Sequence, residues 1–303
     1  MQIKNYSRKS IVMTKGPILI LGGSGMLGHT LWEKAKDRQN VYVALRRIPP
    51  GYEWLFPLDR TILGFEATNF ERVLAILEKV EPSWVINCIG IVKQSPQMQD
   101  PVFVIQVNSL FPHQLAAACS RLGARLIHLS TDCVFSGRRG QYKEEDLPDP
   151  SDFYGRSKLL GEPIEPNTLI LRTSMIGLEL GTRHGLLEWF LSQKGKTVRG
   201  FKRAIFSGLY TGELSRLILD LIDHEPELAG VRHLGSEAIS KYDLLCLIRD
   251  ECQLPIHIEQ DDSVVSDRSL DSSKILKETG IRVPTWSEMA RSIAMDLRKV
   301  RKE

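Results

Sequence analysis

The sequence predicts an α/β fold in which a doubly wound parallel sheet carries a smaller C-terminal lobe. Short apolar runs alternate with stretches of helical periodicity up to about residue 175, as in successive βαβ units. A glycine-rich turn follows the first apolar run. Beyond residue 175, helical stretches are separated by short extended pieces and polar loops, which indicates a second lobe.

Six apolar runs are expected to form strands because each is short, is bounded by turn residues and is apolar on both faces. They are residues 17–21, 41–45, 61–65, 84–88, 125–129 and 168–172. Helices are expected between them at 26–38, 69–80 and 101–122. Thr68 or Asn69 is the expected N-cap of the second helix. Pro112 is expected to bend the third.

In the second half of the chain, helices are expected at 185–194, 211–224, 240–251 and 285–300. We therefore divide the chain into a dinucleotide-binding domain, 17–175, and a mainly substrate-binding lobe, 176–303. Some segments of that lobe are allowed to return to the main sheet. Residues 1–16 are expected to form an N-terminal tail, and residues 136–153 a surface loop between two parts of one site.

Composition argues against several classes of function. The 303 residues contain 40 Lys and Arg against 37 Asp and Glu, which is too balanced for nucleic-acid binding as the main task. No apolar run approaches the roughly 18 residues that a membrane span needs. Five cysteines without a CxxC pair predict a reducing compartment, the cytoplasm. The seven histidines show no zinc-binding spacing, so no metal is expected. A homodimer is an open alternative to a monomer.

A G-x-x-G-x-x-G turn lies directly after the first expected strand. Glycines permit a tight turn and a close approach of the backbone to a pyrophosphate, and the helix that opens there supplies N–H donors. A packing turn would look similar, but this position favours a dinucleotide site and a Rossmann-type sheet. The expected cofactor contacts in the turn are Gly22, Ser24, Gly25, Met26, Leu27 and Gly28.

Arg46 and Arg47 follow the second strand, where an NAD-selective site usually has an acidic residue. A guanidinium suits the 2′-phosphate of NADP, so we expect NADPH, with NADH as the alternative. A solvated basic corner would explain the same residues. Glu66 and Ala67, after the third strand, are expected near the adenine rim, although a surface glutamate is an equally good interpretation.

Tyr154 and Lys158 are four residues apart and so share one face of a helix. An ammonium beside a phenol is expected to lower the pKa of the tyrosine, which makes Tyr154 a usable general acid or base. A Y-x-x-x-K spacing alone carries no weight, because chance produces it readily. It gains weight because Ser130 and Thr131 end the fifth strand upstream, in a chain that opens with the glycine turn.

The order of the glycine turn, Asn87-Cys-Ile-Gly90, Ser130-Thr-Asp132 and Y-x-x-x-K resembles the extended short-chain dehydrogenase/reductase superfamily, from about residue 17 to about 280. Within it, the chain is most similar to the dTDP-4-dehydrorhamnose reductase family of sugar-nucleotide reductases. The segments that carry this resemblance are 129–137, 154–162, 171–174 and 268–271. The resemblance also implies cofactor contacts at Cys88, Ile89 and Gly90.

The resemblance implies a role for each catalytic residue. Thr131 would hydrogen-bond the reacting oxygen, and Tyr154 would deliver the proton. Lys158 would hold the nicotinamide ribose and tune Tyr154. Asn108 is expected either to order a proton relay or to be a helix-surface amide. The implied reaction is hydride transfer from NADPH to the 4-keto carbon of a 4-keto-6-deoxyhexose nucleotide, where donors must already face the developing oxyanion.

Cys133 departs from related enzymes. Sugar-nucleotide dehydratases have a glutamate at this point, so dehydration is disfavoured. Epimerase-reductases similar to GDP-fucose synthase have a cysteine base paired with a histidine, but here His184 is displaced from the matching stretch. A buried, inert Cys133 is the favoured interpretation. A sugar-nucleotide epimerase or epimerase-reductase remains an alternative. A non-catalytic, NADP-binding regulatory subunit is another, because the β subunit of methionine adenosyltransferase resembles the same family.

Cations are expected to converge on the substrate's diphosphate. Arg268 is the favoured candidate because it matches a family motif, and Lys202 and Arg203 follow Gly200-Phe201 in the second lobe. Lys93 either contacts the substrate or faces solvent. Thr131 and Asp132 complete the expected substrate contacts.

Overall fold

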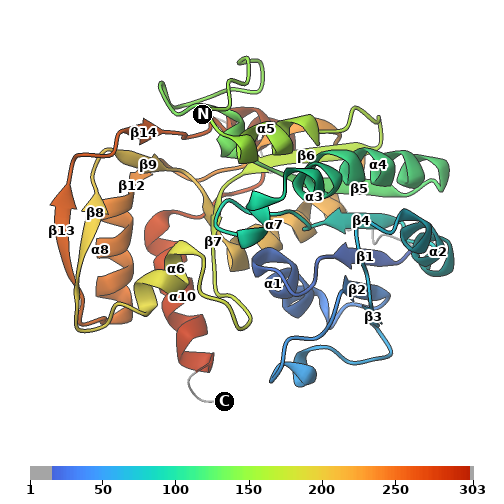
Figure 1. Ribbon diagram of the computed structural model, residues 1–303, viewed down its shortest axis with the longest axis horizontal. Coiled ribbons are helices and arrows are strands. Elements are labelled where there is room, and N and C mark those ends of the chain that lie inside the picture. Colours follow the sequence, from blue (N-terminus) through green and yellow to red (C-terminus); the bar gives the residue numbers. More distant parts are fainter. Residues whose placement is uncertain (1–15, 301–303) are drawn as a thin grey trace, which may run out of the picture.

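The computed structural model describes residues 16–300, with side chains described up to Lys299. The predicted tail at 1–16 therefore lies outside the described residues except for Gly16. A seven-stranded, fully parallel sheet forms the centre, in the order β11-β6-β5-β4-β1-β2-β3 (Figure 1). Its strands are β1 (Ile18–Leu21), β2 (Val41–Leu45), β3 (Thr61–Leu63), β4 (Trp84–Asn87), β5 (Arg125–Thr131), β6 (Thr168–Thr173) and β11 (Gly230–His233).

The predicted doubly wound α/β fold is confirmed, since helices cover both faces of the sheet. All four residues of β1 are buried. Ile18 and Ile20 pack with α1 (Met26–Ala35) and α7 (Thr211–His224), whereas Leu19 and Leu21 pack with α2 (Phe70–Val80) and α4 (Phe111–Arg121). A strand buried on both faces needs this continuous apolar run. The strand order reverses between β1 and β4, and the carboxyl ends of the strands at such a switch point are where α/β proteins bind ligands.

The third expected helix is interrupted before Pro112. It consists of α3 (Pro101–Ile105), a π-helical turn η3 (Gln106–Leu110) and α4. Pro112 has no N–H to donate to the carbonyl of Asn108. Gly161 packs against that carbonyl, where an added Cβ would lie 1.8 Å from the Asn108 oxygen. The helical stretch Pro101–Arg121 is long and apolar enough on average to span a membrane, but over half of its apolar window is buried inside the protein, as in a core helix.

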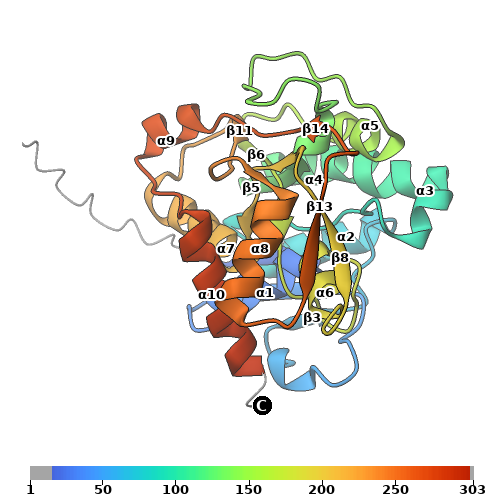
Figure 2. The ribbon, with the colours of Figure 1, turned by 90° about the vertical axis from the view of Figure 1, so that its left-hand side faces the viewer.

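Small sheets and helices build the rest of the second half, with α8, β8 and β13 toward the viewer in Figure 2. β13 pairs with β8, β7 pairs with β10, and β12, β9 and β14 form a three-stranded sheet. The elements are β7 (Met175–Ile176), α6 (Leu186–Leu191), β8 (Thr197–Phe201), β9 (Ala204–Phe206), β10 (Leu209–Tyr210), β12 (Ile239–Ser240), α8 (Lys241–Cys252), β13 (His257–Asp261), β14 (Ser266–Asp267), α9 (Ser273–Thr279) and α10 (Trp286–Val300). The sequence did not predict α9.

The second half also contributes to the main sheet, because β11 pairs with β6. Asn69 is the N-cap of α2 and accepts a hydrogen bond from the Arg72 N–H. The expected surface loop runs up to α5 (Phe153–Leu160) and touches the second half through a bridge between Tyr142 and Leu270. Short 3₁₀ turns lie at η1 (Glu53–Leu55), η2 (Pro96–Gln99) and η4 (Asp132–Val134).

Candidate active site

The glycine turn between β1 and α1 has the geometry that its sequence predicts. Gly22 has φ +85°, and the N–H groups of Gly22 and Gly23 both donate to the Ala44 carbonyl at 3.0 Å. Gly25 is the N-cap of α1, and its N–H donates to the Gly22 carbonyl. At Gly28 an added Cβ would lie 2.1 Å from the Gly22 oxygen. This close approach, together with the positive φ, requires glycine at 22 and 28.

Gly23 is also required, although the motif spacing does not single it out, because an added Cβ would lie 2.2 Å from Val43 Cγ2. The first turn of α1 contains no acidic residue, and no side chain caps it. Its N–H groups are therefore free to face an anion at the carboxyl edge of the sheet, as a pyrophosphate site requires. Leu27 is buried in the core, so its backbone is the part that can reach a cofactor. These residues fit a dinucleotide.

The other predicted cofactor contacts follow the carboxyl ends of β2, β3 and β4. Arg46 and Arg47 are exposed directly after β2, and no ion pair involves either side chain within residues 16–299. Glu66 is exposed after β3, and Ala67 is half-buried against the core. The turn after β4 abuts the glycine turn, since an added Cβ at Gly22 would lie 3.0 Å from Ile89 Cγ1 and 3.2 Å from the Cys88 carbonyl carbon.

Asn108 holds the chain just after Gly90. It is fully buried in the π-helical turn. Its Oδ1 accepts a hydrogen bond from the Ile91 N–H at 2.8 Å, and its Nδ2 donates to the Ile91 carbonyl and to Ser157 Oγ. The surface-amide interpretation is therefore wrong. Asn108 ties the turn after β4 to α5.

β5 and α5 bring together the predicted catalytic residues. Thr131 is the last residue of β5, and its hydroxyl accepts a hydrogen bond from the Cys133 N–H and donates to Asp132 Oδ1. Asp152 caps α5 by accepting from the Gly155 N–H. The helix packs closely on the segment after β5, because an added Cβ at Gly155 would lie 2.1 Å from the Cys133 oxygen.

Tyr154 and Lys158 belong to α5, and both lie against the end of β5. Lys158 is buried, and its Nζ donates a hydrogen bond to the Leu129 carbonyl at 2.8 Å. The net pKa of Tyr154 in this structure is raised, and not lowered as the sequence predicts. Burial raises the pKa of the Tyr154 phenol and the nearby Cys133 raises it further, while contact with Thr131 opposes the rise. Burial also lowers the pKa of Lys158 to about 8. Tyr154 therefore carries its proton at neutral pH.

Cys133 is a poor candidate for a base. Burial raises the pKa of its thiol to about 12, and the neighbouring Asp132 acts in the same direction. The pKa of Asp132 is itself raised by burial, although Cys133 and Arg268 oppose that rise. His184 is exposed on the loop before α6, where its backbone N–H donates to Glu179. The thiol is thus protonated at neutral pH, as in an inert cysteine.

The predicted substrate cations separate into two groups, and the first lies beside the catalytic residues. Arg268 donates through Nε to the Phe135 carbonyl at 3.0 Å and lies within electrostatic reach of Asp132. Lys93 forms an ion pair with Asp152 at 2.5 Å, at the start of α5.

Lys202 and Arg203 do not join that group. Lys202 forms an ion pair with Asp243 at 2.7 Å and lies over the ring of Tyr242. Arg203 is exposed between β8 and β9. Lys241, which no motif in the sequence marks, lies within electrostatic reach of Asp132 and Arg268 instead.

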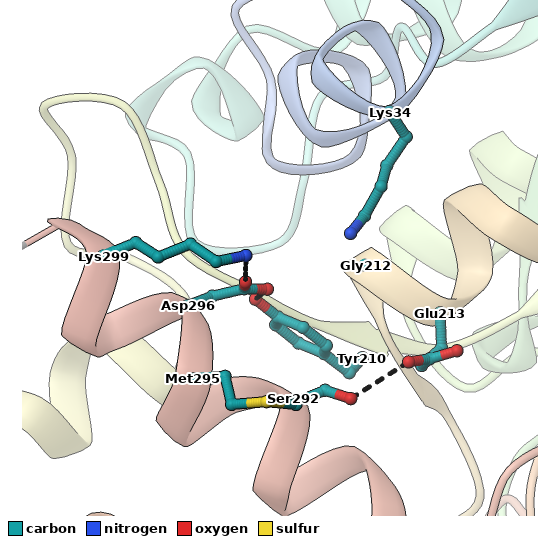
Figure 3. A pocket seen from close by; sticks show the side chains of 8 residues that line it. All are labelled: Lys34, Tyr210, Gly212, Glu213, Ser292, Met295, Asp296 and Lys299. Carbon is teal, nitrogen blue, oxygen red and sulfur yellow. Dashed lines mark hydrogen bonds and ion pairs between the residues drawn. The ribbon is translucent and has the colours of Figure 1, made fainter.

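A separate cavity of about 220 Å³ lies between α1, α7 and α10 (Figure 3). Several of its polar side chains bind one another: the Tyr210 hydroxyl donates to Asp296, and Ser292 donates to Glu213. None of the predicted catalytic or cofactor residues lines this cavity. Among the described residues, no group of three His, Cys, Asp or Glu side chains is placed to hold a metal ion.

A dinucleotide turn at the switch point of a parallel sheet, with threonine, tyrosine and lysine meeting at the end of β5, defines an extended short-chain dehydrogenase/reductase. The chain belongs to the family described as the RmlD substrate binding domain, whose model matches residues 15–299. It is therefore an oxidoreductase of the short-chain dehydrogenase/reductase type, with a nicotinamide dinucleotide as its cofactor.

Relatives with curated names support this assignment. The probable low-salt glycan biosynthesis reductase Agl14 of Haloferax volcanii is 30% identical, over 72% of this chain and 74% of the relative. The dTDP-4-dehydrorhamnose reductase of Aggregatibacter actinomycetemcomitans is 26% identical, over 91% of this chain and 97% of the relative. Methionine adenosyltransferase 2 subunit beta of Mus musculus is also 26% identical, over 78% of this chain and 72% of the relative.

Solved structures share the fold. A hypothetical dTDP-4-dehydrorhamnose reductase from Sulfolobus tokodaii matches with a TM-score of 0.75 and 27% identity, over 89% of this chain and 98% of that one. The dTDP-4-dehydrorhamnose reductase of Bacillus anthracis, solved in complex with NADP, matches with a TM-score of 0.78 and 20% identity, over 93% of this chain and all of that one.

Proposed function

We propose that the protein uses NADPH to reduce the 4-keto group of a 4-keto-6-deoxyhexose nucleotide, in the biosynthesis of a surface polysaccharide or glycan. The observation that carries the proposal is the meeting of Thr131, Tyr154 and Lys158 at the end of β5, beside the turns at Gly22 and Gly90. Relatives named as glycan biosynthesis and dTDP-4-dehydrorhamnose reductases support the substrate class.

In this proposal the chain's own residues bind the ketone and supply its proton. NADPH, when bound, is the source of the hydride. The Thr131 hydroxyl and the Tyr154 phenol hold the reacting oxygen, and Tyr154 gives its proton to the developing alkoxide. Lys158, whose Nζ lies close to Gly90, contacts the nicotinamide ribose and stabilises the phenolate that remains.

The preference for NADPH rests on Arg46 and Arg47. Both guanidinium groups are exposed after β2, where the 2′-phosphate of a cofactor on the glycine turn would lie. We assign residues 17–175 mainly to the cofactor and residues 176–303 mainly to the substrate, although β11 from the second half belongs to the main sheet. Cys88, Cys119, Cys133 and Cys246 are free thiols, which suits the cytoplasm as the site of the reaction.

The test is a screen of NADPH consumption with dTDP-, UDP-, GDP- and CDP-linked 4-keto-6-deoxyhexoses. We expect steady oxidation of NADPH with at least one of them. Incorporation of solvent deuterium at C3 or C5 of the product would instead establish the epimerase alternative. Tight NADPH binding without turnover on any of the four would overturn the proposal and favour a regulatory role, which the methionine adenosyltransferase relatives keep open.

A further inference from the structure

The three-stranded sheet of the second half carries one cation after each of its outer strands. Ser240 of β12 and Asp267 of β14 both pair with Ile205 of the central strand β9, from opposite sides. Lys241 follows Ser240 as the first residue of α8, and Arg268 follows Asp267. The sheet therefore fixes the backbone positions of Lys241 and Arg268 relative to each other.

This sheet is held against the segment that follows the catalytic strand. The Asp267 N–H donates to the Gly137 carbonyl at 2.7 Å, and Arg268 Nε donates to the Phe135 carbonyl at 3.0 Å. At Gly137 an added Cβ would lie 2.5 Å from Ser266 Oγ, so the two segments pack without room for a side chain. The contacts place the start of α8 near Asp132.

Lys241 is half-buried at this point and forms no ion pair with any residue in the described part of the chain. Its electrostatic neighbours are, in decreasing order of effect, Asp132, Arg268, Cys133 and Lys93. Lys202 lies on the same lobe, two residues beyond Gly200. It differs from Lys241 because it forms an ion pair with Asp243. An unpaired ammonium that is partly withdrawn from water favours an anionic ligand.

The charges of this cluster point to a ligand with more than one negative charge. Lys93, Lys241 and Arg268 provide three cations. Asp132 interacts with Lys241 and Arg268, and Asp152 interacts with Lys93 and Arg268. Asp152 is paired with Lys93 and caps α5, and Asp132 is buried and accepts a hydrogen bond from the Thr131 hydroxyl. The three cations thus outnumber these two carboxylates near the catalytic hydroxyls.

We propose that Lys241 is a substrate-binding residue which, together with Arg268 and Lys93, receives the diphosphate of the nucleotide sugar. The inference rests on the proposed function and makes it specific. The diphosphate joins the sugar at C1, across the ring from the 4-keto group that Thr131 and Tyr154 would hold. Cations grouped near these hydroxyls, but not bound to them, are therefore suited to receive the phosphate charge.

The alternative role for Lys241 is to neutralise Asp132 alone. In that case Lys241 would support folding or the state of Asp132 without touching the substrate. The two roles differ in what a neutral side chain at 241 does to the binding of a nucleoside diphosphate, which has phosphates but no sugar to reduce.

The experiment titrates dTDP, UDP, GDP and CDP, and the four matching nucleosides, into the NADP-loaded protein by calorimetry. The variants are Lys241→Met and Lys241→Arg, with Lys196→Met as a control at an exposed lysine of the same lobe. We expect Lys241→Met to weaken binding of the preferred diphosphate about tenfold or more, the usual loss for one charged hydrogen bond. Arginine should retain most of the affinity, and the control and the NADP affinity should stay within twofold of wild type.

Two other outcomes separate a failure of the inference from a failure of the proposed function. If the wild-type protein binds none of the four diphosphates, the proposed function fails along with the inference. If it binds one of them, and Lys241→Met binds the same one equally well, the inference fails and the proposed function stands. Equal diphosphate affinity together with a lowered melting temperature in Lys241→Met would assign Lys241 to Asp132 instead.

Discussion

Tyr154 enters the reaction with its proton in place, because burial raises the pKa of its phenol. A reductase needs the tyrosine in this form, since the alkoxide produced by hydride transfer must take up a proton. From the sequence alone, a lowered pKa is expected instead. The motif places Lys158 one helical turn away, but in the structure its Nζ donates to the Leu129 carbonyl.

We expect Tyr154→Phe to slow reduction by about 10²–10⁴-fold, the usual contribution of a placed general acid. The change removes one oxygen atom, so folding and NADPH affinity should be retained. The measurement is single-turnover oxidation of NADPH at a saturating concentration of the 4-keto sugar nucleotide. A variant within about threefold of the wild-type rate would remove Tyr154 from the mechanism.

The pKa of Lys158 predicts how the rate of reduction depends on pH in the alkaline range. Burial lowers its pKa to about 8, so the side chain is charged below that pH and neutral above it. The charge stabilises the phenolate left on Tyr154, and therefore the single-turnover rate should fall as the pH rises through about 8. Tyr154 keeps its proton in this range because its own pKa is raised.

Lys158→Arg is the matched variant for that profile, since a guanidinium stays charged well above this range. Whatever rate it retains should show no loss between about pH 7 and pH 9.5, because the guanidinium does not titrate there. A wild-type rate that is constant over the same range would show that the charge of Lys158 does not control the reaction.

Cys133 is expected to fill space next to the active site. Its thiol is protonated at neutral pH because burial raises the pKa to about 12. Cys133→Ser should therefore retain most of the reductase activity, measured as NADPH oxidation with the preferred substrate. A loss of a thousandfold or more in a folded variant would contradict this expectation and support the epimerase alternative.

At the scale of single elements, the loop between β1 and α1 could be predicted almost completely from the sequence. Gly22, Gly25 and Gly28 are spaced as a dinucleotide turn requires, and local backbone geometry determines that turn. The role of Gly23 could not be predicted in the same way. It depends on Val43, a side chain of the neighbouring strand that comes close only after the sheet has formed.

The preference for NADPH over NADH is predicted from Arg46 and Arg47, at the carboxyl end of β2. We expect Arg46→Ala or Arg47→Ala to weaken NADPH binding by about 1.5–3 kcal/mol, the contribution of a hydrogen bond to a charged group, while NADH binding changes little. The reason is that the two cofactors differ in the 2′-phosphate alone. Both variants are titrated with both cofactors by fluorescence. If neither variant changes the ratio of the two affinities, the assignment of this corner to the 2′-phosphate is wrong.

At the scale of the whole molecule, the parallel sheet and its helices were predictable because apolar runs and glycine turns are local signals. The small sheets of the second half were less predictable from the sequence. β12, β9 and β14 are only two or three residues long, and they form a sheet because segments distant in the sequence pack together. Lys202 is paired with Asp243 on α8 and lies apart from Arg268 and Lys93, so its substrate contact stays a prediction. Lys241 has no motif in the sequence, and its place near Arg268 depends on this small sheet.

A buried ion pair connects the catalytic strand to the second half. Arg172 binds both carboxylate oxygens of Glu162, at 2.9 and 2.7 Å, and the Ser130 hydroxyl donates to the same carboxylate. Arg172 also contacts Nε2 of His233 on β11 at 3.4 Å. Nδ1 of His233 is 2.9 Å from the Tyr142 carbonyl, so a neutral ring with its proton on Nδ1 satisfies both contacts.

Because both partners are buried, we expect Arg172→Met to destabilise the fold by about 3–5 kcal/mol, the usual cost of leaving one member of such a pair uncompensated. The double variant Arg172→Met/Glu162→Gln should recover part of this loss, since no charge then remains buried. Urea unfolding followed by circular dichroism measures the free energy of unfolding of the wild type and of each variant. Arg216→Met is the control, because its ion pairs with Glu213 and Asp220 are exposed and should contribute less than about 1 kcal/mol. If Arg172→Met is no more destabilising than this control, the ion pair does not hold the end of β5 to the second half, and the active site must be positioned by the sheet alone.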